Sequence, residues 1–270
     1  MLVDAHTHVV SSDQEMYPLS PAALGGSWYL QSPCSAGGLL DEMDTAGVDR
    51  AVLVQPLGAY SFDNRYAVAS ASARPDRLAA ACCVDPYGES PTRTLRDWLD
   101  RPSVAGVRFF ALSEQRSWLS DPATFVLWEQ VAASGAHVIV TVYESQFDEL
   151  ALMLGRFGDV SVSLDHCGFC DVSNLEPLLA LARFENLSLK VTTNIIDAAT
   201  AAGSTARRFV GRLAGGFGAE RLMWGSDYCQ THDRLYAELV RTGIAAFGDL
   251  TGAQQDACLG GNARRVWFGG

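Results

Sequence analysis

The sequence has no long hydrophobic run and no basic segment at its N-terminus. None of its apolar stretches approaches the roughly 20 residues that a membrane-spanning helix needs. Met1 leads directly into Leu2-Val3-Asp4, without the apolar core of a signal peptide. We therefore expect a cytoplasmic protein that does not have a membrane as its partner.

Basic residues and cysteines are also scarce. Only 20 Lys and Arg oppose 31 Asp and Glu, and the resulting net charge of −11 repels nucleic acid. Seven cysteines are too few for a disulfide scaffold in 270 residues, and their number is odd. Cys167 and Cys170 have redox or half-zinc spacing, but no second such pair accompanies them, so we interpret them as ordinary reduced thiols.

What is abundant is apolar sequence, which makes up 48% of the chain and suffices for a large core. Short, β-branched apolar runs recur, separated by turn residues and by stretches long enough for a helix. We predict eight strands from these runs: Leu2 to Val9, Arg50 to Pro56, Leu78 to Asp85, Val104 to Leu112, Ala136 to Tyr143, Val160 to Gly168, Leu187 to Thr193 and Leu222 to Tyr228.

Eight apolar strands that alternate with helices favour a closed parallel barrel covered by helices. We predict a single α/β domain over residues 1–270, a (β/α)₈ TIM barrel. Glycines end the expected helices Gly38 to Ala46, Asp121 to Ser134 and Thr205 to Ala214. The irregular segment from Ser11 to Ala36 follows the first strand, at the end of the barrel where active sites lie.

Polar side chains gather at the carboxyl ends of three predicted strands. His6 and His8 are two residues apart on the first strand, so both point to the same side and can share a metal ion or one substrate oxygen. His166 ends the sixth strand and Asp227 the eighth. Burying unpaired imidazoles and carboxylates costs free energy, so this cluster predicts a functional site rather than part of the core.

Five segments carry the motifs of one enzyme family: Val3-Asp4-Ala5-His6-Thr7-His8, Ala46 to Pro56, Leu164-Asp165-His166, Met223-Trp224-Gly225-Ser226-Asp227 and Gly261-Asn262-Ala263-Arg264-Arg265. Together they resemble the amidohydrolase superfamily. Within it the chain is most similar to the amidohydrolase-2 branch, which contains lactonases of sugar acids and of pyrone or muconate-type dicarboxylates, besides metal-dependent decarboxylases.

The resemblance implies a hydrolase in which Asp227 is the general base and His6, His8 and His166 surround the reacting carbonyl. Many members of the superfamily have a metal-binding histidine at the end of strand five. Here that end reads Thr141-Val142-Tyr143-Glu144. Of the remaining histidines, His137 begins the strand, at the opposite end of the barrel, where we expect a structural role.

This departure leaves two versions of the site open. His6, His8 and Asp227 could hold one divalent metal, zinc or manganese, closed by Glu144, His166 or water. Alternatively the site works without metal, for which the related pyrone dicarboxylate lactonase is a precedent; it has a tyrosine in this region, and Tyr143 is the corresponding candidate here.

Two isolated cations lie on otherwise apolar strands. Arg108 and Lys190 resemble positions where related lactonases keep basic residues, and with Tyr143 they are our candidates for binding the substrate. A guanidinium suits a substrate carboxylate. The competing interpretation is an internal ion pair with Asp85, Glu144 or Asp165. Besides these, His232 follows the eighth strand, either lining the mouth or solvated.

The leading hypothesis is a lactonase that opens a sugar-acid or dicarboxylate lactone, because a leaving alkoxide needs less help from a proton donor than an amine does. The expected partner is a small anionic or polyhydroxylated substrate. One alternative is a metal-dependent decarboxylase. The other is a barrel that binds a small acid without turning it over.

Overall fold

The structure, a computed structural model, describes residues 1–22, 24–113 and 117–269. Its centre is one sheet of eight parallel strands in chain order, each hydrogen-bonded to the next. The strands are β1 (Val3–Thr7), β2 (Arg50–Val54), β3 (Leu78–Cys83), β4 (Val104–Phe110), β5 (His137–Thr141), β6 (Val162–Leu164), β7 (Leu187–Thr192) and β8 (Leu222–Gly225). Each strand lies within one of the eight apolar runs of the sequence.

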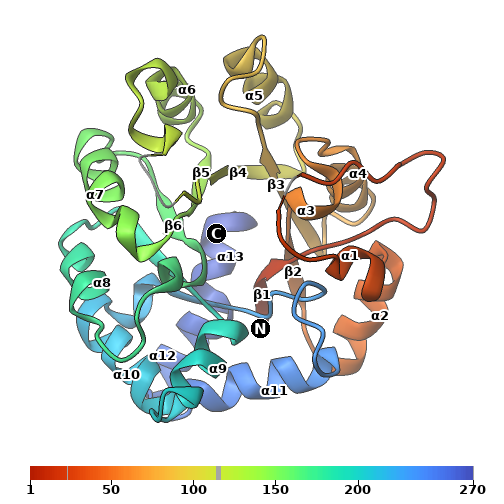
Figure 1. Cartoon of the computed structure of the whole chain (residues 1–270). Helices are drawn as coiled ribbons and strands as arrows, with labels where there is room; N and C mark the ends of the chain where they lie inside the picture. Colours follow the sequence, from red (N-terminus) through yellow and green to blue (C-terminus); the bar gives the residue numbers. More distant parts are fainter. Residues whose placement is uncertain (23, 114–116, 270) are drawn as a thin grey trace.

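The sheet closes because β8 returns to β1. Thr7 and Tyr228 form a parallel bridge, and the amide of His8 donates to the carbonyl of Tyr228 over 2.6 Å. The amide of Asp227 donates to the carbonyl of His6 over 2.9 Å. The predicted (β/α)₈ barrel is confirmed, and the helices form a ring around it (Figure 1).

Helices follow the strands on the outside of the barrel. They are α1 (Trp28–Gln31), α2 (Ala36–Ala46), α3 (Leu57–Tyr60), α4 (Arg65–Ala73), α5 (Pro91–Leu99), α6 (Phe125–Ser134), α7 (Phe147–Arg156), α8 (Glu176–Ala180), α9 (Thr193–Ala201), α10 (Ala206–Phe217), α11 (Tyr236–Ala246), α12 (Gly252–Asp256) and α13 (Asn262–Trp267). In the described residues, no helix is both long enough and apolar enough to cross a membrane.

Two of the three glycine stops lie where the sequence predicts them. Gly47 and Gly135 cap α2 and α6 with φ of 73° and 70°. The third is wrong, because α10 runs through the pair Gly215-Gly216 and ends at Gly218, whose φ is 83°. A Cβ at Gly216 would lie 2.5 Å from Leu179 Cδ2, so that glycine permits close packing rather than a stop.

One end of the barrel is filled by side chains of the strands and covered by α13. Small and branched side chains of the strands point inward there and pack against Ala263 and Trp267 of α13. In Figure 1, α13 lies across the far end of the ring of strands. The opposite end is therefore the one with room for chemistry, as in other barrels of this type.

The segments above β1 and β6 shape that open end. The long segment after β1 is irregular, as expected, apart from α1; residue 23 within it lies outside the described residues. Strand β6 is shorter than predicted because the chain turns at His166, Cys167 and Gly168, whose φ values of 52°, 51° and 67° are left-handed. This turn aims His166 back over the barrel.

Candidate active site

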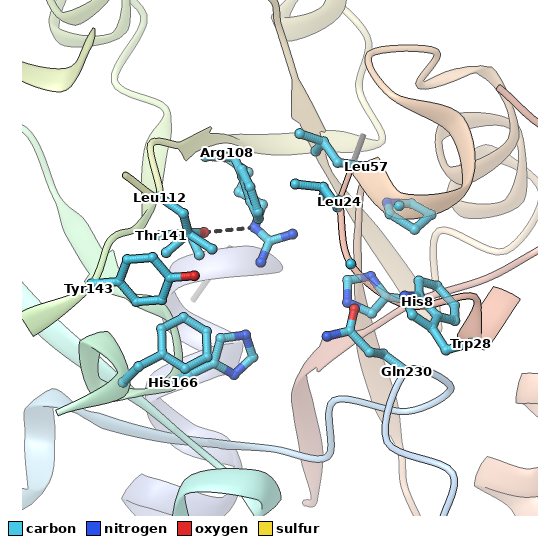
Figure 2. Close-up of a pocket in the computed structure, with 15 residues that line it drawn as sticks. His8, Leu24, Trp28, Leu57, Arg108, Leu112, Thr141, Tyr143, His166 and Gln230 are labelled. Carbon is cyan, nitrogen blue, oxygen red and sulfur yellow. Dashed lines mark hydrogen bonds between the residues drawn. The ribbon is translucent and has the colours of Figure 1, made fainter. Parts of the chain in front are cut away.

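A cavity of about 240 Å³ lies at the carboxyl ends of the strands. Figure 2 shows four polar side chains pointing into it: Arg108 from β4, and His8, Tyr143 and His166 from just beyond the ends of β1, β5 and β6. Its wall is otherwise mostly apolar and aromatic, which is typical of a pocket for a small organic molecule. The described residues that line it are His8, Leu24, Gly25, Trp28, Pro56, Leu57, Gly58, Arg108, Phe110, Leu112, Thr141, Tyr143, His166, Phe169 and Gln230.

His6, His8 and Asp227 come together beside this cavity, and of the three His8 lines it. The Asp227 Oδ1 atom lies 3.6 Å from His6 Nε2 and 3.4 Å from His8 Nε2. The strands can approach this closely because a Cβ at Gly225 would lie only 2.8 Å from His6 Cβ. All three side chains are almost completely buried.

Hydrogen bonds on the far sides of the rings set the tautomers of both histidines. His6 Nδ1 lies 3.0 Å from a carboxylate oxygen of Asp165, and His8 Nδ1 lies 2.8 Å from the carbonyl of Val54. Both partners can only accept, so Nδ1 carries the proton in each ring. The Nε2 atoms of both rings therefore face the Asp227 carboxylate.

Asp227 holds its charge in this surrounding. Its Oδ2 atom accepts from Asn194 Nδ2 over 3.0 Å and from Thr231 Oγ1 over 3.2 Å. Burial alone would raise the pKa of Asp227, but His166, His8 and His6 together hold it below its ordinary value. Burial lowers the pKa of His6 well below its ordinary range, which keeps that ring neutral. His6 Nε2, His8 Nε2 and Asp227 Oδ1 thus converge at one place.

This convergence fits a divalent cation. Among the described residues, His6 Nε2 and Asp227 Oδ1 are buried atoms without a hydrogen-bond partner. With His8 they form a group whose ligand atoms all lie within 4.8 Å of one another. Tetrahedral ligands about 2.0 to 2.1 Å from zinc lie roughly 3.3 to 3.4 Å apart, close to the two separations measured here.

The carboxylate of Asp165 organises the wall beneath Arg108. It accepts from Arg108 Nε over 2.9 Å and from Thr141 Oγ1 over 2.8 Å, and Lys190 Nζ lies 3.5 Å away. Burial alone would raise the pKa of Asp165, but His6, Arg108 and Lys190 hold it well below its usual range. His6, Asp165 and His166 also lie close enough for a shared ion, but Asp165 is already committed to these cations.

A family model described as Amidohydrolase matches residues 3–269. The chain belongs to the amidohydrolase family. It is therefore an enzyme of the amidohydrolase superfamily, as the motifs around His6, His166 and Asp227 imply. No curated protein matches the chain in sequence.

Solved structures of other amidohydrolases share the fold over nearly the whole chain. A candidate 2-pyrone-4,6-dicarboxylic acid hydrolase from Pseudomonas putida is 25% identical, with a TM-score of 0.78 over 98% of this chain and 96% of that one. An amidohydrolase from Burkholderia multivorans with bound zinc is 17% identical, with a TM-score of 0.78 over 98% of both chains. The 5-carboxyvanillate decarboxylase of Sphingomonas paucimobilis is 16% identical, with a TM-score of 0.71 over 98% of both chains.

The three predicted substrate-binding residues of this amidohydrolase lie in different surroundings. Arg108 and Tyr143 line the cavity (Figure 2). Arg108 also makes the ion pair with Asp165 that was the competing interpretation, so it has both features. Lys190 is fully buried, 3.5 Å from Asp165 and over the ring of Trp267, and does not line the cavity.

The other candidates of the amidohydrolase lie farther from its centre. The Glu144 carboxylate accepts from the amide of Asp171 over 2.6 Å. His232 contacts Gln31 and Gln230 above the barrel and does not line the cavity. Cys167 and Cys170 are buried free thiols, and burial raises the pKa of both. His137 is buried in the core, as expected.

Sequence reasoning missed Asn194 and two threonines of the site. Thr192 ends β7 and contacts His166, Asn194 lies in the first turn of α9, and Thr231 follows β8. Neutral polar residues are frequent at strand ends, so their type carries no signal. The rule that barrel sites form where strands end could still have pointed to Thr192 and Asn194.

Proposed function

We propose that this amidohydrolase is a lactonase that opens a ring lactone bearing a carboxylate, using Asp227 as the general base. The observation that carries the proposal is the Asp227 Oδ1 atom, a buried and ionised carboxylate oxygen without a hydrogen-bond partner among the described residues. His8, whose Nε2 atom lies 3.4 Å from this oxygen, lines the cavity of about 240 Å³. A base placed in this way can take a proton from water beside a bound carbonyl.

The reaction follows from this placement. Asp227 Oδ1 takes a proton from water as the water oxygen bonds to the lactone carbonyl carbon, which leaves negative charge on the carbonyl oxygen. The ring C–O bond then breaks as the carbonyl re-forms. The departing alkoxide takes up the proton that Asp227 received, so that a hydroxy acid leaves and the carboxylate is regenerated.

The tautomers support a metal-assisted version of this chemistry. The Nδ1 atoms of His6 and His8 are occupied by Asp165 and by the Val54 carbonyl, so Nε2 is the atom of each ring that can bind an ion. His6, His8 and Asp227 would hold the ion. A bound zinc or manganese would stabilise the charge that grows on the carbonyl oxygen. The related structure that contains zinc has the same fold.

The cavity wall favours a planar, partly apolar substrate over a sugar lactone. The Arg108 guanidinium and the Tyr143 hydroxyl both point into the space above the histidines (Figure 2), where they can bind a carboxylate. Trp28, Phe110 and Phe169 supply aromatic surface around it.

The test combines metal analysis with turnover. Purified protein is analysed for zinc and manganese and then assayed on pyrone-type, muconate-type and sugar-acid lactones, before and after chelation. We expect about one metal per chain and turnover of a carboxylated, unsaturated lactone that chelation abolishes and added metal restores. Full activity after complete metal removal would overturn the metal part. If the metal-loaded protein turns over none of these lactones, the proposal that it is a lactonase is wrong.

A decarboxylase is the second candidate, because the group formed by His6, His8 and Asp227 beside Arg108 also suits a substrate carboxylate. The same samples are therefore assayed for carbon dioxide release from hydroxylated aromatic acids. Release without lactone opening would favour this candidate. Tight binding of these acids with neither reaction would instead indicate a barrel that only binds.

A further inference from the structure

Four polar side chains form a continuous chain of hydrogen bonds between β6, β7 and β8. His166 Nδ1 lies 2.8 Å from Thr192 Oγ1. Thr192 Oγ1 lies 2.6 Å from Asn194 Oδ1, and Asn194 Nδ2 lies 3.0 Å from Asp227 Oδ2. The chain therefore connects the histidine that lines the cavity to the proposed base.

The direction of every bond in this chain follows from its last member. An ionised Asp227 can only accept, so Asn194 presents its NH₂ group there and its carbonyl oxygen to Thr192. That oxygen can only accept in turn, so the Thr192 hydroxyl donates to it. The remaining lone pairs of Thr192 Oγ1 then accept from His166, whose Nδ1 must carry a proton. The contact of 3.4 Å between Asn194 Nδ2 and His166 Nδ1 is too long to compete.

We propose that Thr192 and Asn194 are positioning residues that lock His166 in the tautomer with its proton on Nδ1, while Asn194 also fixes the Asp227 carboxylate. The Nε2 lone pair of neutral His166 then faces the cavity. In this state the ring accepts a hydrogen bond from a water or from a substrate hydroxyl. It does not donate a hydrogen bond to the carbonyl oxygen of the substrate. The assignment rests on the proposed function only in taking Asp227 as ionised.

The surroundings of His166 hold the ring in this orientation. Its backbone has a left-handed φ of 52°, a conformation that few residues other than glycine adopt without support. The ring packs against Phe169, with centroids 4.9 Å apart, and against His6 at 4.7 Å. Thr192 is fully buried, so no bulk water competes for its hydroxyl. Both the ring and its acceptor are therefore fixed.

The tautomer can be read directly by ¹⁵N NMR of histidine-labelled, chelator-treated protein at pH 8. We expect His166 to show a protonated Nδ1 and a pyridine-type Nε2, with its signals assigned from their absence in His166→Gln. Thr192→Val removes the acceptor and should shift the ring to a mixture of tautomers or to the Nε2-protonated form. Thr192→Ser keeps a hydroxyl and should preserve the wild-type pattern.

Thr193→Val is the matched control. Thr193 is the adjacent buried threonine, whose hydroxyl contacts the carbonyl of Gly225 at 3.5 Å and lies outside this chain of hydrogen bonds. It should leave the His166 signals unchanged. Should Thr192→Val not fold, Asn194→Leu gives the same test from the other end, because it frees the Thr192 hydroxyl to donate to His166. An Nε2-protonated His166 in the wild type, or signals unmoved by both variants, would overturn the proposal.

Activity adds a second measurement. Partners that orient histidines and carboxylates from outside a site are typically worth about 10- to 100-fold in activity. We expect Asn194→Leu to lower kcat by at least about 10-fold with little change in KM, since it displaces Asp227 but leaves the cavity wall intact. A locked tautomer without turnover of any lactone would refute the proposed function alone. Lactone turnover with an unlocked tautomer would refute this inference alone.

Discussion

The two ends of the barrel both bury histidine, but in opposite ways. At the covered end, His137 Nδ1 and Nε2 each lie 2.9 Å from a serine hydroxyl, of Ser161 and Ser163. At the open end, His6 Nε2 and Asp227 Oδ1 have no hydrogen-bond partner within the described part of the chain. Burial is nearly complete at both ends, so burial alone does not distinguish structure from function.

The difference lies in how the polar atoms are satisfied. Leaving a buried donor or acceptor unpaired costs about 1 to 3 kcal/mol, more for a charged group, so folds rarely retain one without use. The atoms of His137 are used up within the protein. In His6 and Asp227, one polar atom is hydrogen-bonded to the protein, whereas His6 Nε2 and Asp227 Oδ1 have no partner among the described residues. Positions held in this way are available for a metal, water or substrate.

The largest expected effect comes from Asp227→Asn. Removal of a general base typically lowers turnover by 10²- to 10⁴-fold, and we expect a loss of about 10³-fold or more on the best lactone substrate. Thermal unfolding should change little, because the amide keeps the shape of the side chain and its oxygen can still accept from Asn194 and Thr231. Asp233→Asn, an exposed carboxylate in the following loop, is the control. Comparable turnover in both variants would contradict the view that the unpartnered Asp227 oxygen at the open end is the catalytic base.

The next effect is on stability, at the open end but behind the site. Asp165→Asn leaves Arg108 and Lys190 buried without their shared carboxylate, and breaking a buried ion pair costs about 3 to 5 kcal/mol. Lys190→Met should cost much less, because Asp165 keeps Arg108 and His6 as partners. Urea unfolding measures both free energies. Equal costs would contradict the view that Asp165 is the central residue of the cluster.

Much of the fold could be predicted from the sequence because it depends on local patterns. Each buried parallel strand is a short apolar run, and all eight lie within the predicted runs. The end of α10 could not be predicted, because Gly216 serves contact with Leu179, a residue distant in sequence. A glycine stop and a glycine at a close approach look alike until the fold is known.

The residues of the site likewise fall into those that the sequence predicts and those that it does not. His6, His8, His166 and Asp227 carry a signal in their own residue type, and the structure brings them together. The residue type of Asn194 carries no such signal, because asparagine is equally frequent after strands that have no part in a site. For Arg108, the sequence offered substrate binding or an ion pair as alternatives, whereas the structure shows the ion pair with a guanidinium that also lines the cavity.

The covered end predicts a pH dependence of stability. Burial lowers the pKa of His137 to about 3, from the ordinary 6.5. The unfolded chain therefore binds a proton there between these values, and the stability from neutral His137 is complete above pH 6.5 and lost as the pH falls. The expected slope is about 1.4 kcal/mol per pH unit below pH 6. His137→Gln should flatten the urea-unfolding profile between pH 5 and 6 relative to wild type, and parallel profiles would contradict this.

The smallest effect tests the rim of the open end. Tyr143 is 39% exposed, so its hydroxyl exchanges a hydrogen bond to water for one to the substrate carboxylate. The net gain in binding free energy is therefore small. We expect Tyr143→Phe to raise KM by about 3- to 10-fold with kcat nearly unchanged, corresponding to one hydrogen bond of roughly 1 kcal/mol. His232→Gln, at a histidine outside the cavity, should change neither constant by more than about 2-fold. A larger effect at His232 than at Tyr143 would place the substrate farther out over β8, above Gln230 rather than beneath Arg108.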